Sequence, residues 1–152
     1  MKRRAVAEED RRSVGAWLKN WGELVADVNF KASRSLFAED AVAFGSKVEM
    51  MTSQAQLEAE QWRAIWPSIE GYLYDLATLE LDVSPDRLMA VGMVIFRSTG
   101  LHADGRKFER NGRTTVTLIR DTTGSPWICT HSHVSLKPGT PSPSHGKRSE
   151  KN

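Results

Sequence analysis

The sequence predicts an α+β domain in which helices come first and strands follow. From Val14 to Val28 apolar residues recur at three- and four-residue steps, a second helical stretch ends at Pro67, and after Pro67 the period becomes strand-like. Turn-forming segments such as SPD, ADG and DTTGSP separate the alternating stretches, which favours hairpins between neighbouring strands. We therefore expect a bent antiparallel sheet that wraps around the first helix.

The first helix is predicted to begin near Val14 and to span roughly 18 residues, because the apolar residues from Val14 to Val28 form one stripe at helical spacing. A shorter helical piece, FKASRSLF, should follow it. The apolar residues 41–44 then fit a short strand, which Gly45 ends.

A second main helix should begin after Ser53 and end at Pro67. Ser53 and Gln56 have the spacing of a capping box, and proline ends helices. Four stretches with strand-like composition follow this helix. They are YLYDLATLELDV, RLMAVGMVIFRSTG, KFERNGRTTVTLIR and WICTHSHVSL.

Length and composition fit one domain with a real core, since the chain has 152 residues of which 39% are hydrophobic. Cys129 is the only cysteine, so an internal disulfide and a multi-cysteine zinc site are excluded. No apolar run reaches the roughly 18 to 20 residues that cross a bilayer, and the first residues do not resemble a secretory signal. We expect a cytoplasmic protein without a membrane partner.

The charges divide the chain into three parts. Residues 1–12 form a basic segment predicted to be flexible, and residues 139–152 form a basic, Pro- and Ser-rich tail predicted to be disordered. The folded domain, 13–138, carries a small net negative charge. A nucleic-acid partner is not expected, because such proteins concentrate basic charge on a folded face.

Three stretches resemble the SnoaL-like branch of the nuclear transport factor 2-like superfamily. They are SLFAEDAVAFG, QWRAIWP and GRTTVTLIRD with PWICTHSHVSLKP, and the last also resembles the association domain of calcium/calmodulin-dependent protein kinase II. The resemblance spans 13–138. It implies a cone-shaped curved antiparallel sheet, a pocket between sheet and helices, and a homodimer through the outer face of the sheet. It implies no single activity, since the superfamily includes isomerases, cyclases, dehydratases and modules without chemistry.

The sequence departs from the ketosteroid isomerase pattern of this superfamily. Asp40 matches a common acidic position, but Gly45 stands where those isomerases have their proton-abstracting Asp. Their neutral hydrogen-bonding Asp lies in the penultimate strand, where this chain has Arg113, Thr114 and Thr115. Ketosteroid isomerisation is therefore not expected.

The stretch WICTHSHVSL offers two candidate catalytic residues, His131 and His133. Strict strand alternation would place both on one face with Trp127 and Cys129. Three interpretations stay open. The pair could hold a metal ion, although no third ligand has a matching motif; it could be structural; or one histidine could line a pocket and move a proton. We expect no metal and no cofactor.

Two arginines and four tryptophans complete the candidate site. Arg110 and Arg113 could bind an organic anion, and aromatic walls would come from Trp17, Trp21, Trp62 and Trp66. The alternative is that the tryptophans are core residues, that Arg110 is an exposed turn residue beside NG, and that Arg113 pairs with an acidic residue across the sheet.

The sequence thus predicts a protein that binds a small organic acid or carbonyl compound. If it is an enzyme, His131 or His133 would move a proton while Arg113 stabilises negative charge, without a cofactor. The alternative is a homodimeric ligand-binding or assembly module without catalytic activity.

Overall fold

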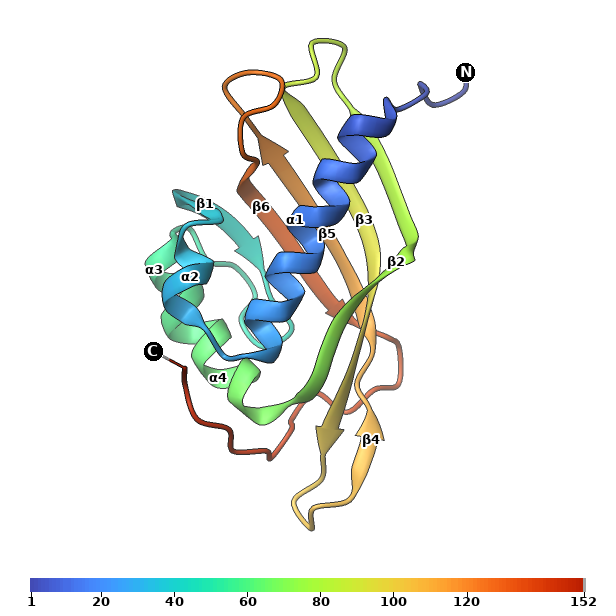
Figure 1. Cartoon of the computed structure of the whole chain (residues 1–152). Coiled ribbons are helices and arrows are strands. Elements are labelled where there is room, and N and C mark those ends of the chain that lie inside the picture. The colour runs from blue at the N-terminus through green and yellow to red at the C-terminus, as the bar shows by residue number, and fades with distance from the viewer. Residues whose placement is uncertain (152) are drawn as a thin grey trace.

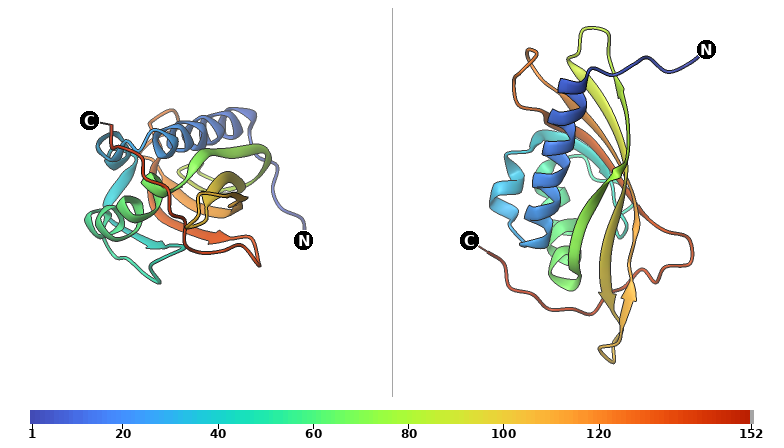
Figure 2. Two further views of the ribbon diagram at one scale, coloured as in Figure 1. Left: turned by 90° about the horizontal axis from the view of Figure 1, so that it is seen from below. Right: turned by 45° about the vertical axis from the view of Figure 1, so that its right-hand side comes forward.

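A six-stranded sheet curves around α1, which lies along its concave face (Figures 1 and 2). The computed structural model describes residues 1–151. Short helices form a second group beside α1. In chain order the elements are α1 (Glu8–Ala26), α2 (Phe30–Arg34), β1 (Phe37–Phe44), α3 (Gln54–Gln56), the π-helix η1 (Leu57–Trp62), α4 (Arg63–Ile65), the 3-10 helix η2 (Trp66–Ser68), β2 (Glu70–Val83), β3 (Met89–Leu101), β4 (Lys107–Glu109), β5 (Gly112–Ile119) and β6 (Ile128–Leu136).

The strands follow the order β1-β6-β5-β3-β2, and β4 pairs with β3. All neighbours are antiparallel except β1 and β6, which are parallel. The α+β prediction is confirmed, but the sheet is mixed rather than wholly antiparallel. The turns predicted from sequence fix only the hairpins from β2 to β6, whereas β1 joins this meander through helices that leave its direction free. The sheet does not close, because β1 and β2, the strands at the two ends of this order, do not pair with each other.

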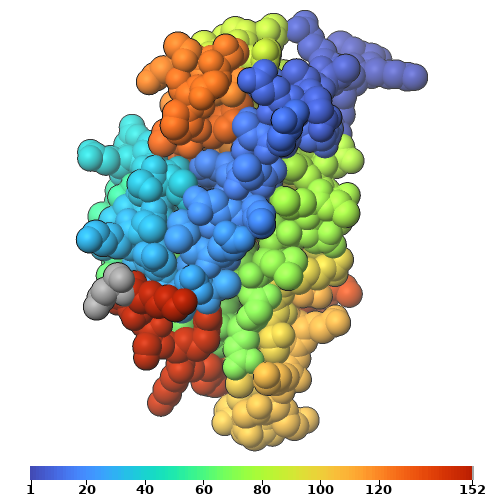
Figure 3. Space-filling view, in the orientation of Figure 1, coloured from blue at the N-terminus to red at the C-terminus, as the bar shows by residue number. Residues whose placement is uncertain are grey.

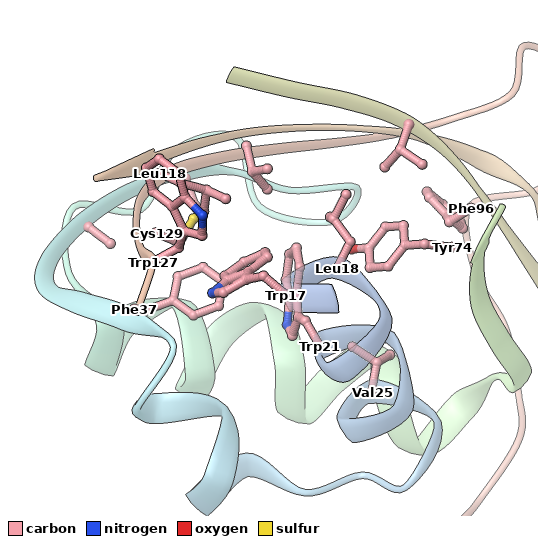
Figure 4. Packing of buried hydrophobic residues seen from close by; sticks show 14 of the residues in the cluster. Trp17, Leu18, Trp21, Val25, Phe37, Tyr74, Phe96, Leu118, Trp127 and Cys129 are labelled. Atoms are coloured by element: carbon pink, nitrogen blue, oxygen red, sulfur yellow. The ribbon is translucent and has the colours of Figure 1, made fainter. Parts of the chain in front are cut away.

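The core lies between α1 and the inner face of the sheet (Figure 4). The rings of Trp17 and Trp21 are 5.4 Å apart, and Trp21 lies 5.1 Å from Phe37 on β1. From the sheet, Tyr74 and Leu118 are also buried. The helical stripe predicted from sequence therefore provides one side of the core. None of the helices within residues 1–151 is both long and apolar enough to cross a membrane.

The N-terminal segment differs from the flexible one predicted for residues 1–12. Helix α1 begins at Glu8, six residues before the predicted start, and Asp10 is fully buried. Ahead of the helix, Arg3 forms ion pairs with Glu80 and Asp82 on β2.

Residues 139–151, here called the C-terminal strap, also differ from the predicted disordered tail. They form no helix or strand, yet they run along the surface beside the end of α1 (Figure 3). The Arg148 side chain donates hydrogen bonds to the carbonyl oxygens of Ala26 and Trp66. The backbone N–H of His145 donates to the carbonyl oxygen of Leu101. Asn152, the last residue of the predicted tail, lies outside the described residues.

Candidate ligand-binding cavity

A cavity lies between the helices and the inner face of the sheet. Its volume is about 40 Å³, which is room for a few water molecules. Its walls come from α1, the end of β1 at Phe44, the helical segment from η1 to η2, and strands β2, β3 and β6. The aromatic residues among its lining are Trp21, Trp62, Trp66, Tyr72 and Phe96.

The helical wall of the cavity begins as the sequence predicts. The Ser53 hydroxyl accepts a hydrogen bond from the backbone N–H of Gln56 at 3.2 Å. The helix then widens into the π-helix η1, a form that is frequent at functional sites. The helical segment from η1 to η2 contributes five residues to the lining of the cavity, namely Leu57, Gln61, Trp62, Ile65 and Trp66.

Arg110 reaches the cavity from the connection between β4 and β5. The sequence predicts one continuous strand here. In the structure, two hydrogen bonds between β3 and this connection each use a side-chain atom in place of a backbone atom. The backbone N–H of Ser98 donates to Asn111 Oδ1, and the Ser98 hydroxyl donates to the Arg110 carbonyl. The backbone N–H of Arg110 still donates to the Ser98 carbonyl at 2.8 Å. Arg110 therefore keeps strand geometry and lies on the same inward face as Gly112 and Thr114.

The guanidinium of Arg110 is buried, and no carboxylate of residues 1–151 pairs with it. The residue is 2% exposed, and the side-chain hydrogen bond it forms in this part of the chain runs from Nη2 to the carbonyl oxygen of Ser142 at 3.2 Å. Its Nε–H has no hydrogen-bond partner within residues 1–151. Burial lowers the pKa of Arg110 below its ordinary value, but an arginine stays charged at neutral pH. The cavity therefore contains an uncompensated positive charge.

The remaining polar groups at the cavity are neutral. The Tyr72 hydroxyl donates to the Tyr74 hydroxyl at 3.1 Å, and burial raises the pKa of Tyr72. This phenol therefore stays protonated at neutral pH. Trp21 Nε1–H is buried without an acceptor among the described residues. Since no Asp, Glu or His is among the lining residues, the cavity offers donors and apolar rings.

The candidate catalytic histidines do not line this cavity. A bulge at Thr130 sets Cys129 opposite Leu118 but His131 opposite Thr117, so the inward positions shift by one. Ser132 then faces inward and is buried, while His131 and His133 lie on the outer face. His131 Nδ1 lies 2.9 Å from the carbonyl oxygen of Val42. The Phe44 ring packs edge-on against both imidazoles, 5.2 Å and 5.4 Å away.

Of the eight site residues predicted from sequence, the cavity brings four together: Trp21, Trp62, Trp66 and Arg110. Trp17 is a buried core residue that does not reach the cavity. Arg113 lies on the outer face, where its Nε donates to Ser135 Oγ. Within the described part of the chain, no three His, Cys, Asp or Glu side chains gather in a metal-binding arrangement.

Comparison with solved structures identifies the architecture. A ketosteroid isomerase-like protein from Erwinia carotovora atroseptica has a TM-score of 0.71 at 14% identity, covering 89% of this chain and 100% of its own. A Salmonella enterica nuclear transport factor 2-like superfamily protein has a TM-score of 0.69 at 12% identity, with 87% and 94% covered. The chain has the nuclear transport factor 2-like fold.

A third similar structure, from Xanthomonas campestris, is named for the calcium/calmodulin-dependent protein kinase II association domain. Its TM-score is 0.70 at 21% identity, with 91% of this chain and 97% of that chain covered. No protein-family model matches the sequence, and no curated protein matches it. At these identities the likeness concerns the fold alone.

Within this nuclear transport factor 2-like fold, the sequence analysis missed several cavity residues. They are Gln61, Tyr72, Phe96 and Ser132. Strand parity could have found Phe96, because the even-numbered residues from Ala90 to Ser98 form the buried face of β3. Gln61 gave no signal, since its role depends on a loop distant in sequence: its Oε1 accepts from the backbone N–H groups of Lys47 and Val48.

Proposed function

We propose that the protein binds a small organic anion in this cavity, with Arg110 as the residue that holds the anionic group. The observation that supports this is the buried guanidinium, which has no carboxylate partner among the described residues. Burying an unpaired charge costs several kcal/mol, which an anionic ligand would offset. A carboxylate fits best, because it can accept two parallel hydrogen bonds from one guanidinium.

The rest of the lining suits the apolar body of an organic acid. Trp62 and Trp66 stack with ring centroids 4.7 Å apart, and Tyr72 stacks on Phe96 at 5.1 Å. A neutral carbonyl compound fits less well, because it would leave the charge of Arg110 uncompensated. The geometry favours binding over the predicted acid/base catalysis, since His131 and His133 lie on the other face of the sheet.

Isothermal titration calorimetry with benzoate and its uncharged isostere benzamide tests this function. Benzoate should bind the unaltered protein, and Arg110→Gln should weaken its binding about 10- to 100-fold, because the variant loses a charge-assisted hydrogen bond. Arg113→Gln is the matched control, since it removes an exposed arginine from the outer face. Benzamide affinity should change little in either variant.

Equal benzoate affinity in the unaltered protein and in Arg110→Gln would contradict the proposal. So would equal losses in Arg110→Gln and Arg113→Gln, since these would indicate a general effect of protein charge. Melting temperatures of both variants show whether the fold is retained.

A second proposed function is self-association through the outer face of the sheet, as in a homodimeric module. The supporting observation is that large apolar side chains are exposed there. Met89 and Ile119 are register partners with exposed fractions of 48% and 39%, and Phe44 is exposed beside the two histidines. Such exposed apolar surface is typical of protein interfaces.

A further inference from the structure

The C-terminal strap ties together two helical elements that carry cavity-lining residues. Arg148 donates from Nη1 to the carbonyl oxygen of Ala26, at the end of α1, and from Nη2 to that of Trp66, at 2.7 Å. Its backbone N–H donates to the carbonyl oxygen of Pro67 at 2.8 Å. Since α1 carries Trp21, and Trp66 itself lines the cavity, Arg148 holds two of the cavity's walls together.

The strap is also attached to the Arg110 side of the cavity. The Ser142 carbonyl oxygen accepts the one hydrogen bond of the Arg110 side chain. Two residues further on, the Ser144 hydroxyl donates to the Ser68 carbonyl at 2.5 Å and accepts from the backbone N–H of Leu101 at 2.9 Å. These bonds connect η2 to the end of β3.

All these attachments are polar. The strap contains no large apolar residue besides prolines, forms no helix or strand, and is mostly exposed. Each of its hydrogen bonds can be exchanged for one with water, so the strap can detach without disrupting the core. The strap therefore has the weak apolar attachment that local opening of a segment requires.

The cavity has to open for an organic acid to enter. Its volume of about 40 Å³ holds a few waters but not an aromatic or aliphatic acid. We propose that the C-terminal strap is the clasp of this cavity: its release lets the walls separate, and the ligand's anionic oxygen replaces the Ser142 carbonyl oxygen on Arg110. This inference rests on the proposed function, because it assigns the ligand's anion to Arg110.

From this proposal we expect that removing hydrogen bonds between the strap and the domain speeds ligand entry. In stopped-flow tryptophan fluorescence with benzoate as the probe, Arg148→Ala should raise the association rate constant about tenfold, because the open form is more populated. Lys147→Ala is the matched control: it also removes one positive charge from the strap, but Lys147 makes no side-chain hydrogen bond or ion pair within residues 1–151.

If Arg148→Ala lowers the melting temperature too far for measurement, Ser144→Ala replaces it. Benzoate association at the unaltered rate in these strap variants would overturn the clasp and leave the proposed function intact.

A readout without ligand separates the two proposals. All five tryptophans are buried, so acrylamide quenching of their fluorescence reports how often the interior opens. Arg148→Ala should raise the quenching constant at least about twofold, while Lys147→Ala should leave it unchanged. If benzoate binds no form of the protein, the proposed function fails, and this result still decides the clasp: unchanged quenching in Arg148→Ala overturns it.

Discussion

Arg120 Nη2 donates to Oδ1 of Asp10 at 2.7 Å, in an ion pair whose two side chains are each 1% exposed. Asp10 Oδ2 also accepts from Arg87 Nε at 2.7 Å, and the Arg120 guanidinium lies 4.0 Å from the Trp127 ring centre. Because Asp10 lies in the first turn of α1 and Arg120 directly follows β5, this cluster fixes the helix against the sheet.

Asp10→Ala should lower the free energy of unfolding by about 3–5 kcal/mol, because the buried charge of Arg120 would lose its carboxylate partner. The control is Glu9→Ala, whose exposed carboxylate pairs, within residues 1–151, with Arg87 alone and should contribute less than about 1 kcal/mol. Urea denaturation followed by circular dichroism measures both values. Similar small losses in the two variants would contradict the role of this buried pair.

The same pair predicts how stability depends on pH. The hydrogen bond from Arg87, together with that from Arg120, lowers the pKa of Asp10 below its ordinary value of 3.8. The unfolded chain therefore takes up a proton at higher pH than the folded protein, so the stabilisation is complete above about pH 4 and is lost as pH falls through the lowered value. Denaturation midpoints measured from pH 6 to pH 2 should fall less steeply in Asp10→Asn. Parallel curves for the two proteins would show that Asp10 does not titrate in this way.

The burial of Asp10 is a feature that local sequence patterns cannot predict. Its neighbours are charged, so the local pattern is that of a flexible segment, and the residue that makes it buried lies 110 positions away. The helical stripe from Val14 onward and the alternation after Pro67 could be predicted, because they depend on local periodicity. The strap was missed for the same reason as Asp10, since its partners at Ala26 and Trp66 are distant in sequence.

Strand geometry explains why Arg113, His131 and His133 do not reach the cavity although the sequence analysis named them as site residues. Arg110 and Arg113 are three positions apart on nearly continuous strand structure, so their side chains lie on opposite faces, and parity alone could have separated them. Parity could not have placed His131 and His133. The bulge at Thr130 reverses the alternation between Cys129 and Ser132, and no local residue pattern marks it.

Arg110→Met should stabilise the protein while it abolishes benzoate binding. Methionine keeps an apolar stem in a buried site and removes an unpaired charge, so the free energy of unfolding should rise by about 1–3 kcal/mol despite the lost bond to Ser142. Thermal denaturation and calorimetry measure the two effects. A purely structural arginine would show the opposite, a clear loss of stability.

His131→Gln and His133→Gln should leave benzoate affinity unchanged within about twofold, because neither side chain reaches the cavity. His131→Gln should cost about 1 kcal/mol if the new side chain does not restore the hydrogen bond with the Val42 carbonyl. His133→Gln should cost less than about 0.5 kcal/mol, since the residue is exposed. A specific loss of affinity in either variant would return that histidine to the ligand site.

Ile119→Asp should convert a homodimer into a monomer. We expect the unaltered protein to sediment at about twice its chain mass of 17.0 kDa, because Phe44, Met89 and Ile119 leave apolar surface on the outer face that a second copy would cover. A charge at position 119 would be buried without a partner in such an interface. Leu76→Asp is the control, since Leu76 has an almost equal exposed fraction, 38% against 39%, but lies beside α1. Sedimentation velocity at micromolar concentration distinguishes the outcomes, and a monomeric unaltered protein would exclude the self-association that we propose.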